Sequence, residues 1–218
     1  MLFRSRHGDY FAFFGLPRTL TIDGQDLERR FRDLSRKFHP DYYYNASPAE
    51  RLASLERSSY LNDAYRALRN LVSRIEHLLA IEGLPAATSD DSSSGPAAVK
   101  VPPGLLEEVF ALNEELDEIR DGRESGADRA GLRVRLDAAR LPIERKRDEH
   151  ERQLQELALR WDGQQSAGAA DRRATLEALR ERLLERNYIN NLLAAIGREM
   201  ASLDVAAVPP GQEPESRG

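Results

Sequence analysis

Apolar residues recur at helical spacing along most of this chain, and this periodicity constrains the fold more than any other feature. Between residues 26 and 38, four apolar side chains follow one another at steps of four, three and four residues, which places them on one face of a helix: Leu27, Phe31, Leu34 and Phe38. Runs of alternating β-branched residues, which would indicate strands, are nearly absent. The sequence therefore predicts an all-α fold.

One segment interrupts the helical pattern. Residues 83–104 read GLPAATSDDSSSGPAAVKVPPG and are rich in Gly, Pro, Ser and Ala, a composition that buries little apolar surface and is typical of linkers. The tail after Leu203, DVAAVPPGQEPESRG, is rich in Pro and Gly and is predicted to be disordered. We therefore expect four parts, which are a domain over residues 9–82, a linker over 83–103, a second domain over 104–203 and a disordered tail over 204–218.

The first domain is predicted to begin with a short helix over residues 9–14, which Gly15 and Pro17 stop. A second helix over residues 26–38 ends there, because Pro40 disfavours helical backbone in the residue before it. It should pair with the next helix as an antiparallel hairpin.

That third helix begins at SPAE, where Ser47 is the N-cap and Glu50 completes a capping box. It is predicted to continue to about Leu68, and a fourth helix covers residues 71–81. The apolar surface of the third helix is expected to come from Leu52, Leu55, Leu61, Ala64, Tyr65 and Leu68.

The second domain is predicted to contain three long helices, over residues 103–121, 127–161 and 171–203. Pro142 lies inside the second of them and should kink or split it. Short loops between long amphipathic helices favour an antiparallel bundle. The core seam of its first helix is expected to be Leu105, Val109, Leu112, Leu116 and Ile119.

Composition excludes several classes of function. The 218 residues include no cysteine, which removes disulfides and thiolate metal sites, and the four histidines are never three or four residues apart. We therefore expect no cofactor and no metal. A net charge of −5 argues against nucleic-acid binding. No apolar run approaches the roughly 20 residues of a membrane span, and the N-terminus lacks a signal-peptide pattern, so we expect a cytoplasmic protein that does not enter a membrane.

The tripeptide His39-Pro40-Asp41 follows the second helix and admits three interpretations. It could be a catalytic pair with His39 as the base, a helix-ending turn, or a docking tip. The docking interpretation is favoured because the preceding helix carries a stripe of like charges, which repel one another and therefore suit an acidic partner better than solvent. That stripe consists of Arg29, Arg32 and Arg36, with Lys37 beside it.

These residues resemble a J domain, from DYFAFFGLP through the basic helix and the His-Pro-Asp loop to NDAYRALRN. J domains present the tripeptide and the basic helix to a heat-shock protein 70-type ATPase and stimulate its ATP hydrolysis. The resemblance implies a chaperone-binding site at His39, Pro40 and Asp41, supported by Arg29, Arg32, Arg36 and Lys37. It also implies that the chain is an activator of an ATPase and not itself an enzyme.

The match extends to LNDAYRALRNLVSRIEHLLAIEG and, after the linker, to LNEELDEI, and is similar to the HscB family. These co-chaperones of iron–sulfur cluster assembly have an N-terminal J domain, with a helical hairpin and flanking short helices, joined to a C-terminal three-helix bundle. The resemblance implies two partners, an HscA-like chaperone and an IscU-type iron–sulfur scaffold. Two alternatives stay open, a generic J-domain co-chaperone with a different client and a structural helical adaptor.

A second apolar row lies one residue off the seam of the first bundle helix, at Leu106 and Phe110, and a similar row on the last helix contains Leu184 and Tyr188. These rows could widen the buried stripe, or they could form an exposed partner site rimmed by carboxylates. The HscB resemblance favours the second interpretation and implies scaffold binding by Leu106, Phe110, Glu114 and Tyr188.

Overall fold

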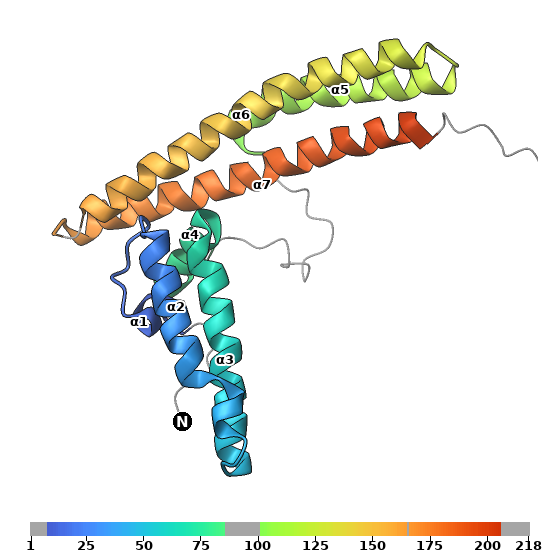
Figure 1. Cartoon of the computed structure of the whole chain (residues 1–218). Helices are drawn as coiled ribbons and strands as arrows, with labels where there is room; N and C mark the ends of the chain where they lie inside the picture. The colour runs from blue at the N-terminus through green and yellow to red at the C-terminus, as the bar shows by residue number, and fades with distance from the viewer. Residues whose placement is uncertain (1–7, 86–100, 165, 206–218) are drawn as a thin grey trace, which may run out of the picture. The chain divides into compact units, whose positions relative to one another are not determined.

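The computed structural model describes residues 8–85, 101–164 and 166–205. Within these ranges the chain is helical and contains no strand, so the predicted all-α class is confirmed (Figure 1). The elements are α1 (Tyr10–Phe14), α2 (Gly24–Phe38), the 3₁₀ helix η1 (Pro40–Tyr43), α3 (Pro48–Arg69), α4 (Leu71–Ile81), the 3₁₀ helix η2 (Pro103–Leu105), α5 (Leu106–Glu124), α6 (Arg129–Gly163) and α7 (Ala169–Val205). None of the described helices combines the length and apolarity that crossing a bilayer requires.

The chain forms two compact units, and both are discontinuous in sequence. The first contains the described part of residues 1–95 together with 153–183, and the second contains the described part of residues 96–152 and 184–218. The position of the linker at residues 83–103 predicts instead that all of residues 104–203 belong to the second domain. The structure groups residues 153–183 with the N-terminal helices because their apolar side chains complete the first core: Leu154, Ala158, Trp161, Leu176, Leu179 and Leu183.

In the first unit, α2 and α3 form the predicted antiparallel hairpin, in which Phe31 and Tyr65 stack with ring centroids 4.3 Å apart. The capping box at Ser47 and Glu50 is present, and α4 has the predicted bounds. Gly15 caps α1 with a φ of 65°, a left-handed conformation that glycine adopts at little cost. Local signals therefore predicted these helix boundaries well.

Long-range hydrogen bonds fix the loop between α1 and α2 within this unit. The Asp162 carboxylate accepts the backbone N–H groups of Leu20 and Thr21 at 2.6 and 2.7 Å. Trp161 donates its indole N–H to the carbonyl of Arg18 at 2.8 Å. The buried guanidinium of Arg74 donates to the carbonyls of Leu20 and Leu68. Buried polar groups of this loop thus find partners far away in the sequence.

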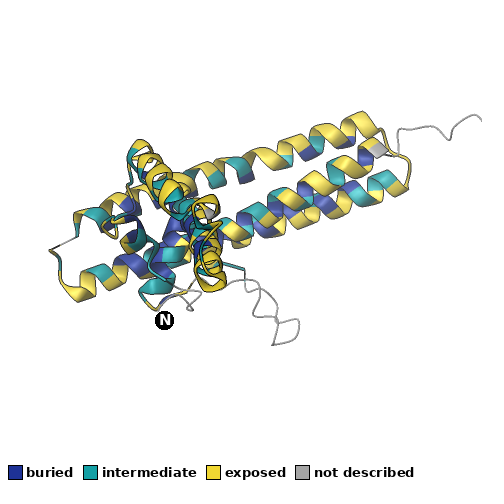
Figure 2. Cartoon of the chain, turned by 60° about the horizontal axis from the view of Figure 1, so that its bottom comes forward, coloured by how far each residue is buried: buried dark blue, intermediate teal, exposed yellow. Residues whose placement is uncertain are grey.

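Two residues of the apolar set predicted on α3 do not pack. Leu52 and Leu55 are 58% and 55% exposed. Ser54 is the buried residue of this turn, and its Oγ bonds to the carbonyl of Phe38, the last residue of α2. The first turns of α3 therefore lie at and beyond the end of α2, where the short η1 packs against α3 in place of α2, and Figure 2 shows this tip largely exposed.

The second unit is built from α5, the N-terminal part of α6 and the C-terminal part of α7. The predicted α5 seam is buried and packs against both other helices through Leu132, Leu136, Ile143, Ile189, Leu192, Ile196 and Leu203. The expected split of the second long helix at Pro142 is wrong, because α6 continues through the proline without a break, whereas the alternative of a kink stays a prediction. Pro142 is exposed while its neighbour Ile143 is buried, so packing on one face stabilises the helix although the proline lacks an N–H.

Candidate functional site

The His-Pro-Asp tripeptide forms a corner between α2 and α3. Helix α2 ends at Phe38, and His39 takes an extended conformation with φ −62° and ψ 127°. The 3₁₀ helix η1 then begins at Pro40, whose side chain lies outside the described part of the structure. The backbone N–H of Asp41 donates to Nδ1 of His39 at 3.3 Å, so His39 caps η1. The imidazole is held against the corner's own backbone.

Both polar side chains of the corner face solvent. The side chain of His39 is 50% exposed and that of Asp41 is 86% exposed, and an Asp41 carboxylate oxygen lies 3.5 Å from Nδ1. A neutral imidazole accepts the Asp41 N–H through Nδ1, whereas a protonated one would pair with the carboxylate. A base oriented for catalysis is normally enclosed with its substrate, so this exposed pair fits a docking tip better than a catalytic dyad.

Contacts from α3 position the corner. The Oγ of Ser54 donates to the Phe38 carbonyl at 3.0 Å, which satisfies an acceptor at the C-terminus of α2. The guanidinium of Arg57 lies 5.9 Å from the centroid of the Phe38 ring, and the ring of Phe13 from α1 lies 6.1 Å away. The end of α2 is therefore fixed on two sides before the chain turns at His39.

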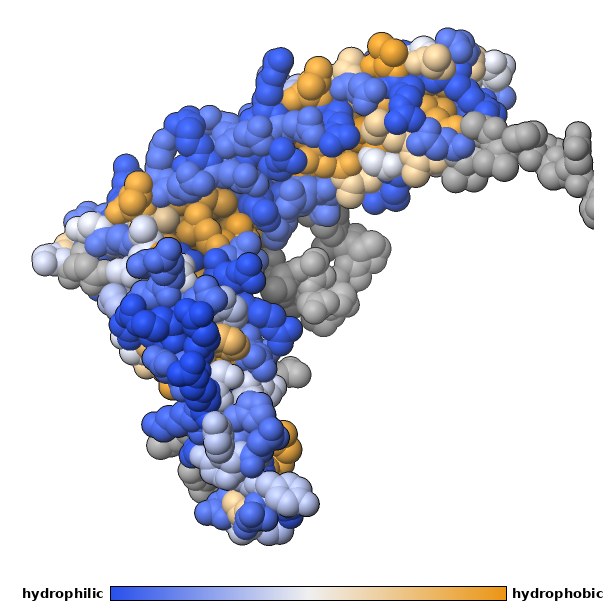
Figure 3. Space-filling model, viewed as in Figure 1, coloured by the Kyte–Doolittle hydropathy of each residue, from blue (hydrophilic) through white to orange (hydrophobic). Residues whose placement is uncertain are grey.

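The basic face of α2 is less uniform than the sequence suggested. Arg29 pairs with Asp26, and Arg32 lies 3.8 Å from Glu28, so acids one turn earlier partly neutralise two members of the predicted stripe. Within the described ranges, Arg36 and Lys37 form no ion pair, and both are exposed next to the corner. Figure 3 shows the surface over α2 as strongly hydrophilic. Uncompensated positive charge is thus concentrated beside His39 and Asp41.

Four apolar side chains near the corner were not predicted as site residues. Tyr42 and Tyr44 follow the tripeptide and are exposed, and the exposed Leu52 and Leu55 lie on the following helix. The run YYY after Asp41 was the only sequence signal for them, since periodicity alone does not distinguish an exposed leucine from a buried one.

In the second unit, the row next to the α5 seam is exposed. Leu106 and Phe110 are 41% and 70% exposed, and Glu114 follows on the same face at the next interval of four residues. On α7, Tyr188 is half-buried against the core of this unit, and Leu184 is at the margin of exposure. The interpretation of Leu106 and Phe110 as part of a widened buried stripe was therefore wrong, whereas Tyr188 is shared between core and surface.

Neither unit offers a metal site within the described residues, where no three His, Cys, Asp or Glu side chains cluster.

No protein-family model matches this sequence. Two solved structures are similar to it. Chaperone HscB from Vibrio cholerae has a TM-score of 0.56 and 26% sequence identity, over 89% of this chain and 99% of that one. The human co-chaperone protein HscB has a TM-score of 0.57 and 21% identity, over 89% of this chain and 83% of that one, and this likeness supports the fold alone. The resemblance to HscB co-chaperones that the sequence indicated is confirmed, as is the architecture of a J domain joined to a helical bundle.

Proposed function

We propose that this chain is a cytoplasmic co-chaperone that binds an IscU-type iron–sulfur scaffold and stimulates ATP hydrolysis by an HscA-like, heat-shock protein 70-type chaperone. The J domain over residues 9–82 engages the ATPase, and the bundle over residues 104–203 binds the scaffold. The chain itself performs no chemistry, so its contribution is to raise the effective concentration of the scaffold near the chaperone.

The observation that carries the proposal is the exposed His39–Asp41 corner with Arg36 and Lys37 beside it, in a chain with the HscB fold. An exposed polar tip flanked by uncompensated cations suits an acidic docking surface on the ATPase. Arg29 and Arg32 extend this site, because surface ion pairs such as theirs contribute little and can be exchanged for pairs with a partner.

For the scaffold, the supporting observation is the exposed row of Leu106, Phe110 and Glu114 on α5, with Tyr188 on α7 in the same unit. An exposed phenylalanine beside a second large apolar residue and a carboxylate has the composition of an interface core with a polar rim. Phe110 is the expected anchor, since few residues carry most of an interface's binding energy and aromatic ones are enriched among them.

The ATPase test titrates the HscA-like chaperone from the same organism with wild type, His39→Gln and Arg66→Gln. Arg66 is an exposed residue of α3 that pairs with Asp63 and serves as the matched control. We expect stimulation by wild type and by the control, none by His39→Gln, and a decline of stimulation with ionic strength. Equal stimulation by His39→Gln would rule out the docking site.

The scaffold test measures the dissociation constant of the IscU-type protein from the same organism. We expect Phe110→Ala to weaken binding about tenfold or more, and Leu159→Ala, at an exposed apolar position of α6 outside the patch, to leave it unchanged. ATPase stimulation without scaffold binding would point to the generic J-domain co-chaperone with another client. The absence of both would leave the structural adaptor.

A further inference from the structure

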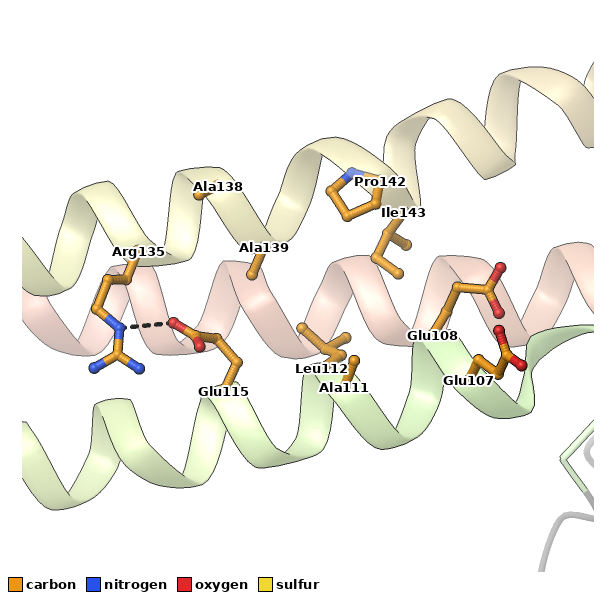
Figure 4. Close-up of a pocket in the computed structure, with 10 residues that line it drawn as sticks. All are labelled: Glu107, Glu108, Ala111, Leu112, Glu115, Arg135, Ala138, Ala139, Pro142 and Ile143. Atoms are coloured by element: carbon orange, nitrogen blue, oxygen red, sulfur yellow. Dashed lines mark hydrogen bonds and ion pairs between the residues drawn. The ribbon is translucent and has the colours of Figure 1, made fainter.

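A groove of about 540 Å³ lies between α5 and α6 in the second unit (Figure 4). Its apolar lining comes from both helices, through Ala111, Leu112, Ala138, Ala139, Pro142 and Ile143. Leu112 and Ile143 are buried core residues. Three of the other lining residues are alanines, and these short side chains leave the space that larger ones would fill.

Two ion pairs between α5 and α6 bracket this groove. Lys146 donates to Glu108 at 2.7 Å, and Arg135 donates to Glu115 at 2.7 Å, the latter pair drawn in Figure 4. The two glutamates are seven residues apart, which corresponds to about 10 Å along the helix. The groove is therefore a preformed site with room for one or two side chains of a partner, and its width is held at both ends.

The wall on α6 also offers a backbone acceptor. Pro142 has no N–H, so the carbonyl of Ala138 lacks its usual helical donor four residues later. Ala138 is exposed and lines the groove. A partner that donates a hydrogen bond there would satisfy a group that this helix leaves without its regular bond.

One carboxylate at the groove is uncompensated. Glu107 is exposed and, among the residues that the structure describes, takes part in no ion pair. Glu108 beside it is already paired with Lys146, whose hydrogen bond lowers the pKa of the Glu108 carboxyl group, so Glu107 is the carboxylate left for a partner's cation. This end of the groove therefore favours a lysine or arginine next to an apolar side chain.

The groove adjoins the row proposed to bind the scaffold. Glu107 and Ala111 directly follow Leu106 and Phe110 on α5, and each step turns the side chain by about 100° around the helix. A protein that covers the outer face of α5 at Leu106 and Phe110 would therefore also reach the groove, which begins at the neighbouring residues Glu107 and Ala111.

We propose that the α5–α6 groove is a second anchor site for the same scaffold protein, taking an apolar side chain that has a lysine or arginine beside it. This proposal rests on the proposed function. It adds Ala138 and Pro142 of α6 and Glu107 of α5 to the residues that determine which client binds.

The experiment measures the dissociation constant of the IscU-type scaffold for four variants of the full chain. Ala138→Leu fills the groove without removing a packed side chain, and Ala201→Leu makes the same change at an exposed site of α7 as its control. Glu107→Lys reverses the charge at the groove, and Asp121→Lys does so at an exposed position near the end of α5. Circular dichroism melting verifies that each variant is folded.

We expect Ala138→Leu to weaken binding at least tenfold and Glu107→Lys at least threefold, with both controls within twofold of wild type. If Phe110→Ala lost binding while Ala138→Leu and Glu107→Lys bound as well as wild type or more tightly, the groove would not be an anchor site for the scaffold. The proposed function would remain intact. A wild type that does not bind the scaffold would overturn both. If the dissociation constant depended on salt concentration equally in wild type and in Glu107→Lys, this would also contradict the proposal that the scaffold places a lysine or arginine at Glu107.

Discussion

The Oγ of Ser54 on α3 donates a hydrogen bond to the carbonyl of Phe38 at 3.0 Å across 16 residues of sequence. Ser54 is buried, and Phe38 is the last residue of α2 before the His39 corner. This bond connects the corner to α3. The orientation of the exposed residues His39 and Asp41 therefore depends on Ser54, a buried side chain that cannot contact a binding partner directly.

Replacement of Ser54 by alanine should therefore affect both the stability of the fold and the stimulation of the partner ATPase. We expect Ser54→Ala to lower the free energy of unfolding by about 1 kcal/mol, because the Phe38 carbonyl loses its donor, and to reduce ATPase stimulation without abolishing it. Urea unfolding and the ATPase titration measure the two effects. Ser59→Ala, at an exposed position of the same helix, should change neither. Full stimulation by Ser54→Ala would show that the corner keeps its orientation without this bond.

The carboxylate of Asp162 should be a major stabilising group of the first unit. It accepts two backbone N–H groups, from Leu20 and Thr21, and charge-assisted bonds of this kind are stronger than neutral ones. Asp162→Ala is expected to cost about 2–4 kcal/mol of unfolding free energy. Asp63→Ala breaks only the exposed pair with Arg66 and should cost well under about 1 kcal/mol. Similar urea midpoints for the two variants would contradict this assignment.

Alkaline pH should destabilise the folded chain through ionisation of Tyr60. Burial against Tyr10 and Phe13, with ring centroids 5.2 and 4.8 Å away, raises the pKa of Tyr60 to about 12. A raised pKa in the folded state means that its contribution to stability is present below pH 10 and lost as the pH rises from about 10 to 12. Spectrophotometric titration of wild type minus Tyr60→Phe should show one phenol that ionises near the top of this range. A difference curve centred near pH 10 would refute the shift.

Replacement of Pro142 by alanine should raise the free energy of unfolding. In Pro142→Ala, α6 recovers the N–H that the Ala138 carbonyl lacks, and a helix-interior proline costs up to about 3 kcal/mol relative to alanine. We expect an increase of about 1–3 kcal/mol in unfolding free energy by urea denaturation, because Pro142 is exposed and leaves no cavity. Leu141→Ala, an exposed neighbour, should change stability by less than about 0.5 kcal/mol. A destabilised Pro142→Ala would mean that α6 is shaped around the proline.

Local signals account for what the sequence predicted well. The capping box of Ser47 and Glu50, the glycine after α1 and the spacing of the α5 seam all act within a few residues, so they are readable without a structure. The composition of residues 83–104 predicted the division into two parts, and the HscB resemblance added their identity as a J domain and a three-helix bundle, because the tripeptide and its flanking helices are specific in combination.

Long-range packing accounts for the rest. The bond from Leu20 to Asp162 spans 142 residues, and no periodicity connects the two. Helical spacing also treats Leu52 and Leu61 alike, although the first lies past the end of α2 and the second is buried. Exposure at Leu106 and Phe110 likewise depends on where neighbouring helices lie. The roles assigned to these residues and to the tripeptide remain predictions for the experiments above.

The partnership of Asp162 and Trp161 with the loop at Arg18–Thr21 has a consequence for synthesis on the ribosome. The N-terminal helices emerge first, yet the side chains that close their core are translated much later, and at roughly 5–20 residues per second the delay is several seconds. During that interval the nascent chain exposes apolar surface that is later buried. A protein proposed to recruit a chaperone would therefore itself be a candidate for binding by chaperones while it is being translated.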